Sequence, residues 1–214
     1  MEINNATFVT SMPYYRDYAG IGLPEVAVAG KSNVGKSSMI NCLCRRRKLA
    51  KTSSTPGKTR LLNVFDIEGR LRLVDLPGYG FAKVDKGEKQ KWARMMEGYF
   101  ADSSTLRLVL HLVDIRHEPT QDDRDMTGFL RAYNIPFTVV ATKADKISRA
   151  ARMRHIAVIC RALQVQPWEV IPWSSETGEG RGAVLAALEK VAEAAQEEGM
   201  RALEPGAPLE PLDG

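Results

Sequence analysis

The fold of this 214-residue chain is decided by one stretch near its start, Gly30-Lys31-Ser32-Asn33-Val34-Gly35-Lys36-Ser37. An apolar run of strand length precedes this stretch and a helix-forming segment follows it. The pattern G-x-x-x-x-G-K-S in that setting predicts a loop, continuing to Ser38, whose backbone N–H groups surround phosphates. Lys36 would reach the β- and γ-phosphates, and the Ser37 hydroxyl would bind Mg²⁺ at the positive end of the helix. A chance glycine-rich turn is the alternative, and the flanking strand and helix disfavour it.

Length and composition favour one α/β domain with short tails. The net charge of +4 and the isoelectric point near 9.0 are compatible with a nucleic-acid partner, although charge alone favours an ordinary solvated basic face. The sequence has no apolar stretch long enough for a membrane span and no signal peptide at its start, so we expect a cytoplasmic protein. We expect it to be a monomer.

Apolar runs of strand length alternate with helical segments, which predicts an α/β fold with helices on both faces of a sheet. The second and third runs are separated only by Glu68-Gly69-Arg70, a length typical of a tight antiparallel turn. We therefore predict a mostly parallel six-stranded sheet with one antiparallel edge strand. The predicted strands are 25–29, 61–67, 71–75, 106–114, 137–142 and 170–173, and the predicted helices are 36–48, 86–101, 120–133, 148–163 and 179–196.

The domain boundaries follow from these segments. Residues 1–22 are expected to pack on the domain, 23–198 to form it, and 199–214, rich in proline and glycine, to be a disordered tail. In the helix predicted to follow Ser148, the apolar stripe Met153, Ile156, Ala157, Cys160 and Leu163 is expected to face the core, with Ser148 as the N-cap.

The sequence Asp75-Leu76-Pro77-Gly78 ends a predicted strand, so its carboxylate emerges at the edge where ligands bind in open α/β sheets. Asp75 would hold Mg²⁺ through water, and the Gly78 N–H would face a γ-phosphate. Alone, D-x-P-G is more often a turn. Its position shortly after the phosphate-binding loop favours the functional interpretation.

A third motif, Thr142-Lys143-Ala144-Asp145, closes another predicted strand and matches the [NT]-K-x-D pattern of guanine-specific proteins. A carboxylate at Asp145 can accept two hydrogen bonds from guanine, and adenine offers no such pair of donors. The Lys143 stem would pack along the base. After the last strand, Trp173-Ser174-Ser175-Glu176 lies where such proteins contact the guanine O6, although serine-rich loops are usually only loops.

Between the first two motifs, the segment 52–60 offers three threonines as a further ligand of Mg²⁺. Thr59 is favoured because it directly precedes a strand, and Gly57 and Lys58 would join it at the nucleotide. This segment would order with GTP and loosen with GDP.

With these motifs in order, the sequence closely resembles the EngB family (also called YihA or YsxC) of bacterial GTPases, in the TrmE-Era-EngA-EngB group. The resemblance covers about residues 8–191 and rests on PEVAVAGKSNVGKSS, TSSTPGKTR, LVDLPGYGFAKV, LVDIRH with the following Pro119 and Asp122-Asp123, and TKADK. It implies GTP hydrolysis, a role in large ribosomal subunit assembly with rRNA as a partner, and a role in septation during cell division. The closing motif, SSET, departs from the usual S-A-K and looks like the family's own version.

Two positions bear on hydrolysis. Tyr79 follows Gly78, where many small GTPases carry the glutamine that orients water, and this predicts slow intrinsic hydrolysis without a partner. Asn33 occupies the position at which TrmE-type GTPases hold a potassium ion, and a turn residue in a left-handed conformation is an equally good explanation.

Three basic clusters are candidates for rRNA contact, or else ordinary solvated surfaces: Arg45 to Lys48 with Lys51; Lys83, Lys86, Lys89 and Lys91; and Arg149, Arg152 and Arg154. Two other functions are open: a cell-division or interaction protein that uses nucleotide only structurally, and a P-loop kinase or ATPase. Asp145 argues against the last of these.

Overall fold

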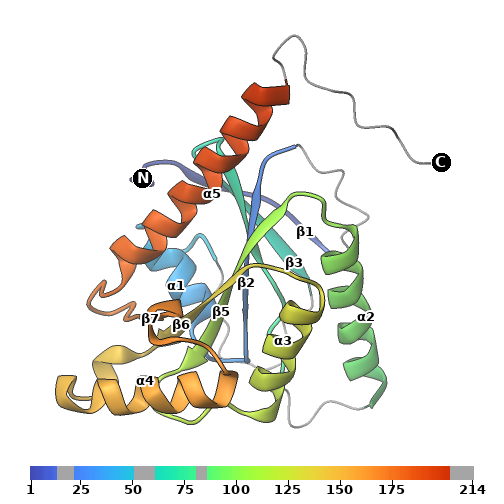
Figure 1. Cartoon of the computed structure of the whole chain (residues 1–214). Helices are drawn as coiled ribbons and strands as arrows, with labels where there is room; N and C mark the ends of the chain where they lie inside the picture. The colour runs from blue at the N-terminus through green and yellow to red at the C-terminus, as the bar shows by residue number, and fades with distance from the viewer. Residues whose placement is uncertain (14–21, 51–60, 81–85, 203–214) are drawn as a thin grey trace.

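The computed structural model describes residues 1–13, 22–50, 61–80 and 86–202. One seven-stranded sheet has the order β1-β3-β4-β2-β5-β6-β7, which places β2, the strand before the phosphate-binding loop, at its centre (Figure 1). The strands are β1 (Ala6–Met12), β2 (Glu25–Gly30), β3 (Leu62–Ile67), β4 (Leu71–Asp75), β5 (Leu106–Asp114), β6 (Phe137–Thr142) and β7 (Val170–Pro172). The pairs β4–β2, β2–β5, β5–β6 and β6–β7 are parallel, so their carboxyl ends meet at one edge.

Helices cover both faces of this sheet (Figure 1). They are α1 (Lys36–Leu43), α2 (Lys86–Asp102), α3 (Gln121–Ala132), α4 (Arg149–Leu163) and α5 (Arg181–Ala202), with short 3₁₀ turns η2 (Ala144–Lys146) and η3 (Pro167–Glu169). Alternate residues of β2 enter different cores, since Val26 and Val28 pack with α1 and α5 whereas Ala27 and Ala29 pack with α2 and α3. A third cluster packs α4 against β6.

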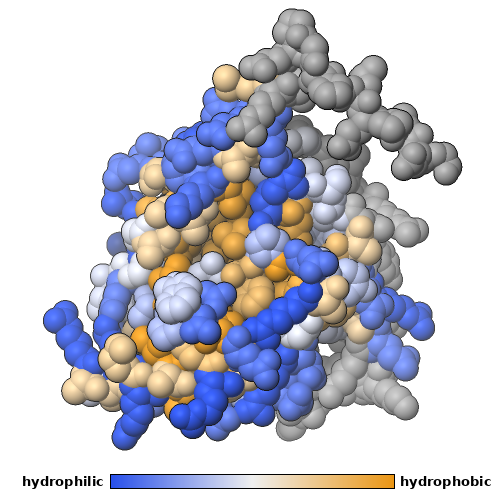
Figure 2. Space-filling view, in the orientation of Figure 1, coloured by the Kyte–Doolittle hydropathy of each residue, from blue (hydrophilic) through white to orange (hydrophobic). Residues whose placement is uncertain are grey.

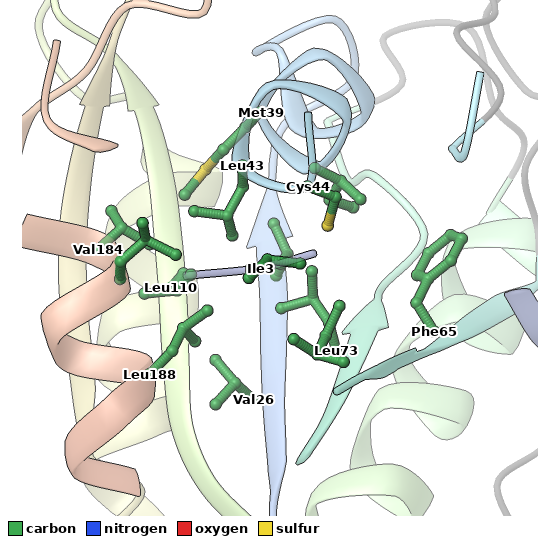
Figure 3. Packing of buried hydrophobic residues seen from close by; sticks show 14 of the residues in the cluster. Ile3, Val26, Met39, Leu43, Cys44, Phe65, Leu73, Leu110, Val184 and Leu188 are labelled. Atoms are coloured by element: carbon green, nitrogen blue, oxygen red, sulfur yellow. The ribbon is translucent and has the colours of Figure 1, made fainter. Parts of the chain in front are cut away.

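Figure 3 shows the first of these cores, in which Met39 and Leu43 of α1 and Leu188 of α5 meet side chains of the central strands. Ile3 also belongs to this cluster, so the start of the chain packs against the domain. The largest fully buried side chain is Trp173, directly after β7. The phosphate-binding loop and the segment after β7 are therefore both supported by rigid packing.

The predicted α/β fold is confirmed, but the strand count and the edge were wrong. β3 runs antiparallel to β4 as expected, and β1 adds a seventh strand outside β3, also antiparallel to it. β3 is consequently second from the edge. Sequence reasoning missed β1 because it is an edge strand with two large apolar side chains, Phe8 and Val9, left exposed, so it lacks a buried run.

Three helices differ from their predicted form. α5 begins at Arg181 and continues to Ala202, past the predicted end at 196 and into the predicted 199–214 tail. α1 ends at Leu43 instead of 48, because Arg45 takes a left-handed conformation (φ 50°) that closes the helix. The N-cap of α4 is Ser148, as predicted, with its Oγ accepting from the N–H of Ala151. However, Met153 is 71% exposed and Ala157 is exposed, so the stripe that faces the core is formed by Ile156, Ile159 and Leu163.

The helix surfaces away from the sheet carry hydrophilic side chains, as Figure 2 shows along α4 and α5. Among the residues described, no helix has the length and apolar character that a membrane crossing requires.

Candidate nucleotide-binding site

The predicted phosphate-binding loop joins the carboxyl end of β2 to the start of α1. Gly30 is required there, because a Cβ atom would lie 2.9 Å from both the carbonyl oxygen of Leu112 and Cγ1 of Val34. Gly35 forms the N-cap of α1 with φ 112°, a conformation that L side chains rarely adopt. Asn33 has φ 62°, so it is the left-handed turn residue that one of the two interpretations expected. This conformation leaves the potassium interpretation open.

Lys36 and Asp75 face each other at the base of this loop. Burial lowers the pKa of Lys36, an effect that the Asp75 charge partly opposes. Burial raises the pKa of Asp75 to about 6, against the opposing effects of Lys36 and a hydrogen bond from Asn63. Among the residues described, Asp75 Oδ1 has no hydrogen-bond partner although it is buried. A buried carboxylate oxygen in this position, beside Lys36, is the hard oxygen donor that suits Mg²⁺ or its water shell.

The D-x-P-G segment, residues 75–78, lies directly against the loop. The N–H of Ser32 donates to the carbonyl of Tyr79 at 2.9 Å, and Lys31 and Tyr79 form a parallel bridge. A Cβ atom on Gly78 would lie 3.0 Å from Lys36 Nζ and 3.1 Å from the backbone N and Cα of Ser32, so a larger residue would require the loop to shift. Leu76 is hydrogen-bonded to Val28 of β2.

The T-K-x-D segment is connected to the same loop from the other side. Thr142 Oγ1 donates to the carbonyl of Val34 at 2.8 Å, and Lys143 Nζ donates to the carbonyl of Asn33 at 3.0 Å. Lys143 has φ 62°, which turns the chain from β6 into η2. The segment that we expect to read the base is therefore fixed relative to the phosphate-binding loop.

Asp145 lies on η2, held by the loop that follows β7. Ser174 Oγ donates to Asp145 Oδ1 at 2.7 Å, and Lys146 Nζ lies 3.0 Å from Asp145 Oδ2. These two contacts lower the pKa of Asp145, with Ser174 the larger cause, so Asp145 is a carboxylate at neutral pH. Ser174 Oγ also accepts the N–H groups of Glu176 and Thr177, and the carbonyl of Trp173 accepts the N–H of Ala144.

Sequence reasoning missed Asp114 and Arg116, which complete this side of the site. Asp114 binds Arg116 through both carboxylate oxygens and Lys143 Nζ at 2.9 Å. Burial acts to raise the pKa of Asp114, yet hydrogen bonds from Arg116 and Lys143 outweigh it and hold that pKa below its ordinary value. The available signal was the position of Asp114 at the end of an apolar strand.

The structure thus brings together most of the predicted residues: Gly30 to Ser38, Asp75 to Gly78, Thr142 to Asp145 and Trp173 to Glu176. Gly57, Lys58 and Thr59 lie outside the described residues. A cavity of about 250 Å³ lies beside the loop, lined among others by Ser32, Asn33 and Asp114.

A phosphate-binding loop on the central strand, a D-x-P-G segment against it and a T-K-x-D segment joined to it define a P-loop protein of the GTPase class. A family model described as "50S ribosome-binding GTPase" matches residues 25–143. The chain belongs to the EngB family of GTP-binding proteins, because relatives of that name are 46% to 52% identical to it over 88% to 89% of its length. Membership implies GTP binding and hydrolysis.

The chain is 51% identical over 189 residues to "Probable GTP-binding protein EngB" of an Exiguobacterium species, covering 88% of this chain and 96% of the relative. It is 46% identical to the protein of the same name from Bacillus subtilis, covering 89% and 98%. A solved structure titled "Crystal structure of a probable GTP-binding protein engB" has the same fold (TM-score 0.65, 23% identity, 79% of this chain and 99% of that one). Era, solved with MgGDPNP and a fragment of 16S ribosomal RNA, gives a TM-score of 0.61 at 25% identity and covers 90% of this chain and 60% of that one.

Replacing Asp145 by Asn tests base recognition. We expect GDP affinity to fall by about 10- to 100-fold and xanthosine diphosphate to become the better ligand, because an amide offers the donor that the xanthine 2-oxygen accepts. Isothermal titration with both nucleotides measures this. Asp125→Asn, an exposed aspartate on α3, is the matched control. Unchanged affinity for GDP in the Asp145 variant would remove the assigned role.

Proposed function

We propose that this GTPase is a nucleotide switch in the cytoplasm that acts in assembly of the large ribosomal subunit and is required for normal septation. The observation that carries this proposal is the match to a family described as 50S ribosome-binding GTPases. The alternative is a cell-division or interaction protein that uses nucleotide only structurally. GTP-dependent binding to large-subunit particles distinguishes the two functions. We further propose that the chain acts as a monomer with one GTPase domain. This domain includes β1 of the N-terminal segment and extends to the end of α5 at Ala202, and the residues after Ala202 would be a tail.

In this proposal the nucleotide phosphates bind at residues 30–38 and the guanine between Lys143 and the 173–176 segment. Asp75 Oδ1 is buried and has no hydrogen-bond partner in the described part of the chain, which supports a metal at this position. Ser37 and Asp75, with Thr59, would hold Mg²⁺, which supplies positive charge to the phosphates. Asp145 would accept from guanine with the carboxylate that Ser174 orients.

The side chain of Tyr79 supports slow intrinsic hydrolysis. Its phenol is turned into the interior, only 5% of the residue is exposed, and its hydroxyl is bonded to Asp123. A group held in this way does not orient an attacking water at the nucleotide, so a partner has to supply what the glutamine of other GTPases does.

We expect the isolated protein to hydrolyse GTP slowly in single-turnover assays, and fast hydrolysis would contradict this interpretation of Tyr79.

Comparing the rates of GTP hydrolysis in potassium chloride and in sodium chloride decides the role of Asn33. Faster hydrolysis in potassium that is lost in Asn33→Gly, with GDP affinity retained, identifies a potassium ligand, because glycine keeps the left-handed turn and removes the amide. Equal rates in the two salts leave Asn33 as a turn residue.

The basic clusters differ in how well they suit an RNA partner. Arg45, Arg46, Arg47 and Lys48 form four consecutive exposed residues after α1, next to the segment expected to respond to GTP. In the α4 cluster, Arg152 is partly buried and paired with Glu179, whereas Arg149 and Arg154 are exposed. The lysine side chains of the cluster that begins at Lys83 lie outside the described part of the structure. We therefore propose the Arg45–Lys48 surface as the rRNA contact.

Reversing charge at this surface tests the proposal. The double variant Arg46→Glu/Arg47→Glu should bind large-subunit particles at least about tenfold more weakly in the GTP-bound state, with the slope of log affinity against log salt reduced by about 1.5 to 2. Co-sedimentation at several salt concentrations measures both quantities. Arg149→Glu/Arg154→Glu is the matched control, expected to bind normally. If the unmodified protein does not bind large-subunit particles, or binds them equally with and without GTP, the alternative of a protein that uses nucleotide only structurally is favoured. If only the Arg149→Glu/Arg154→Glu variant loses binding, the rRNA contact lies on α4 instead.

A further inference from the structure

A buried polar cluster lies under the D-x-P-G segment, and the predicted site does not use it. It consists of Tyr79, His111 of β5, and Asp123 and Thr127 of α3, each no more than 5% exposed. Tyr79 Oη lies 2.8 Å from His111 Nε2 and donates to Asp123 Oδ1 at 2.8 Å. Such a cluster is costly to bury unless every donor and acceptor is paired.

The hydrogen bonds of the Tyr79 hydroxyl can be satisfied by a neutral histidine. Burial lowers the pKa of His111 to about 4, and the neutral tautomer with its proton on Nε2 donates to Tyr79, which leaves the Tyr79 hydroxyl to donate to Asp123 and His111 Nδ1 as an acceptor. Thr127 Oγ1 donates to the Asp123 carbonyl and lies 3.3 Å from His111 Nδ1. The second carboxylate oxygen of Asp123 accepts both the N–H and the hydroxyl of Thr120. The phenol is thus fixed to the start of α3.

The backbone of Tyr79 is fixed on its other side to the phosphate-binding loop. Its carbonyl accepts from Ser32, and the preceding residue, Gly78, makes the close approach to Lys36 Nζ described above. Trp92 of α2 adds a contact to this segment, since its Nε1 donates to the carbonyl of Pro77 at 3.1 Å and its ring meets that of Tyr79 edge to face. The peptide between Gly78 and Tyr79 therefore has little freedom to rotate.

We infer that His111 and Asp123 are positioning residues for the γ-phosphate. Through Tyr79 they hold Gly78 where its N–H meets the terminal phosphate of GTP, and so contribute to the preference for GTP over GDP. This inference rests on the proposed contact between Gly78 and that phosphate. It assigns the hydroxyl of Tyr79 a role in phosphate sensing, separate from the water-orienting role that this side chain lacks.

The test is Tyr79→Phe, which removes one hydroxyl and keeps the ring packing. We expect affinity for a non-hydrolysable GTP analogue to fall by about tenfold while affinity for GDP changes by less than about twofold, because GDP has no phosphate at this position. His111→Leu, which removes the donor to Tyr79 from a different strand, should change the same ratio in the same direction. Titration calorimetry on the full chain gives all of these constants.

The matched control is Tyr99→Phe. Tyr99 is also fully buried and its hydroxyl also donates to a carboxylate, Glu25 Oε2 at 3.0 Å, but Glu25 begins β2 and so lies at the end of that strand opposite the loop. This variant should leave the ratio of the two affinities unchanged. If Tyr79→Phe weakens both nucleotides equally, or neither, the inference is overturned while the proposed GTPase function stands. If the unmodified protein binds the GTP analogue no better than an ATP analogue, the proposed function itself fails.

Discussion

Two hydrogen bonds from the end of β6 to the phosphate-binding loop join the parts of the site on which everything else depends. Thr142 Oγ1 and Lys143 Nζ bind the carbonyls of Val34 and Asn33, residues that lie more than 100 positions earlier in the chain. Both carbonyls belong to a loop whose N–H groups are expected to face phosphates, so their oxygens must point outward and need donors there. Thr142 at the end of β6 and Lys143 directly after it supply these donors, which fixes the T-K-x-D segment relative to the phosphate-binding loop.

The rest of the site is arranged around this connection. On one side, Asp114 pairs with Lys143 and is itself bound by Arg116, and Ser174 orients Asp145. On the other side, the D-x-P-G segment is hydrogen-bonded to the loop through Ser32 and anchored in the interior by the phenol of Tyr79. We propose that specificity for the base resides in the half of the site formed by Lys143, Asp145 and Ser174. Sensitivity to the terminal phosphate would reside in the half that Tyr79 and its buried polar partners hold in place.

Much of the fold and of the site could be predicted from the sequence, because the motifs are local and each follows a strongly apolar strand. Asp75 and Asp145 follow such strands, and parallel strands bring their carboxyl ends to one edge. Contacts between residues that lie far apart in the chain are not indicated by any local sequence motif. Neither the pairing of Asp114 with Lys143 nor the contacts of Tyr79 with His111 and Asp123 follow from spacing along the chain. Apolar residues do not always face a core: Met153 was predicted to be buried and is exposed, and the exposed Phe8 lies on β1, the strand that sequence reasoning missed.

The central claim, that one rigid unit selects guanine and binds its phosphates, is tested most directly by titrating the unmodified, nucleotide-free protein with matched non-hydrolysable analogues of GTP and ATP in the presence of Mg²⁺. The contacts around Asp145 predict at least about 100-fold tighter binding of the guanine nucleotide, since adenine would leave a carboxylate without donors. Equal affinities for the two analogues would contradict the account.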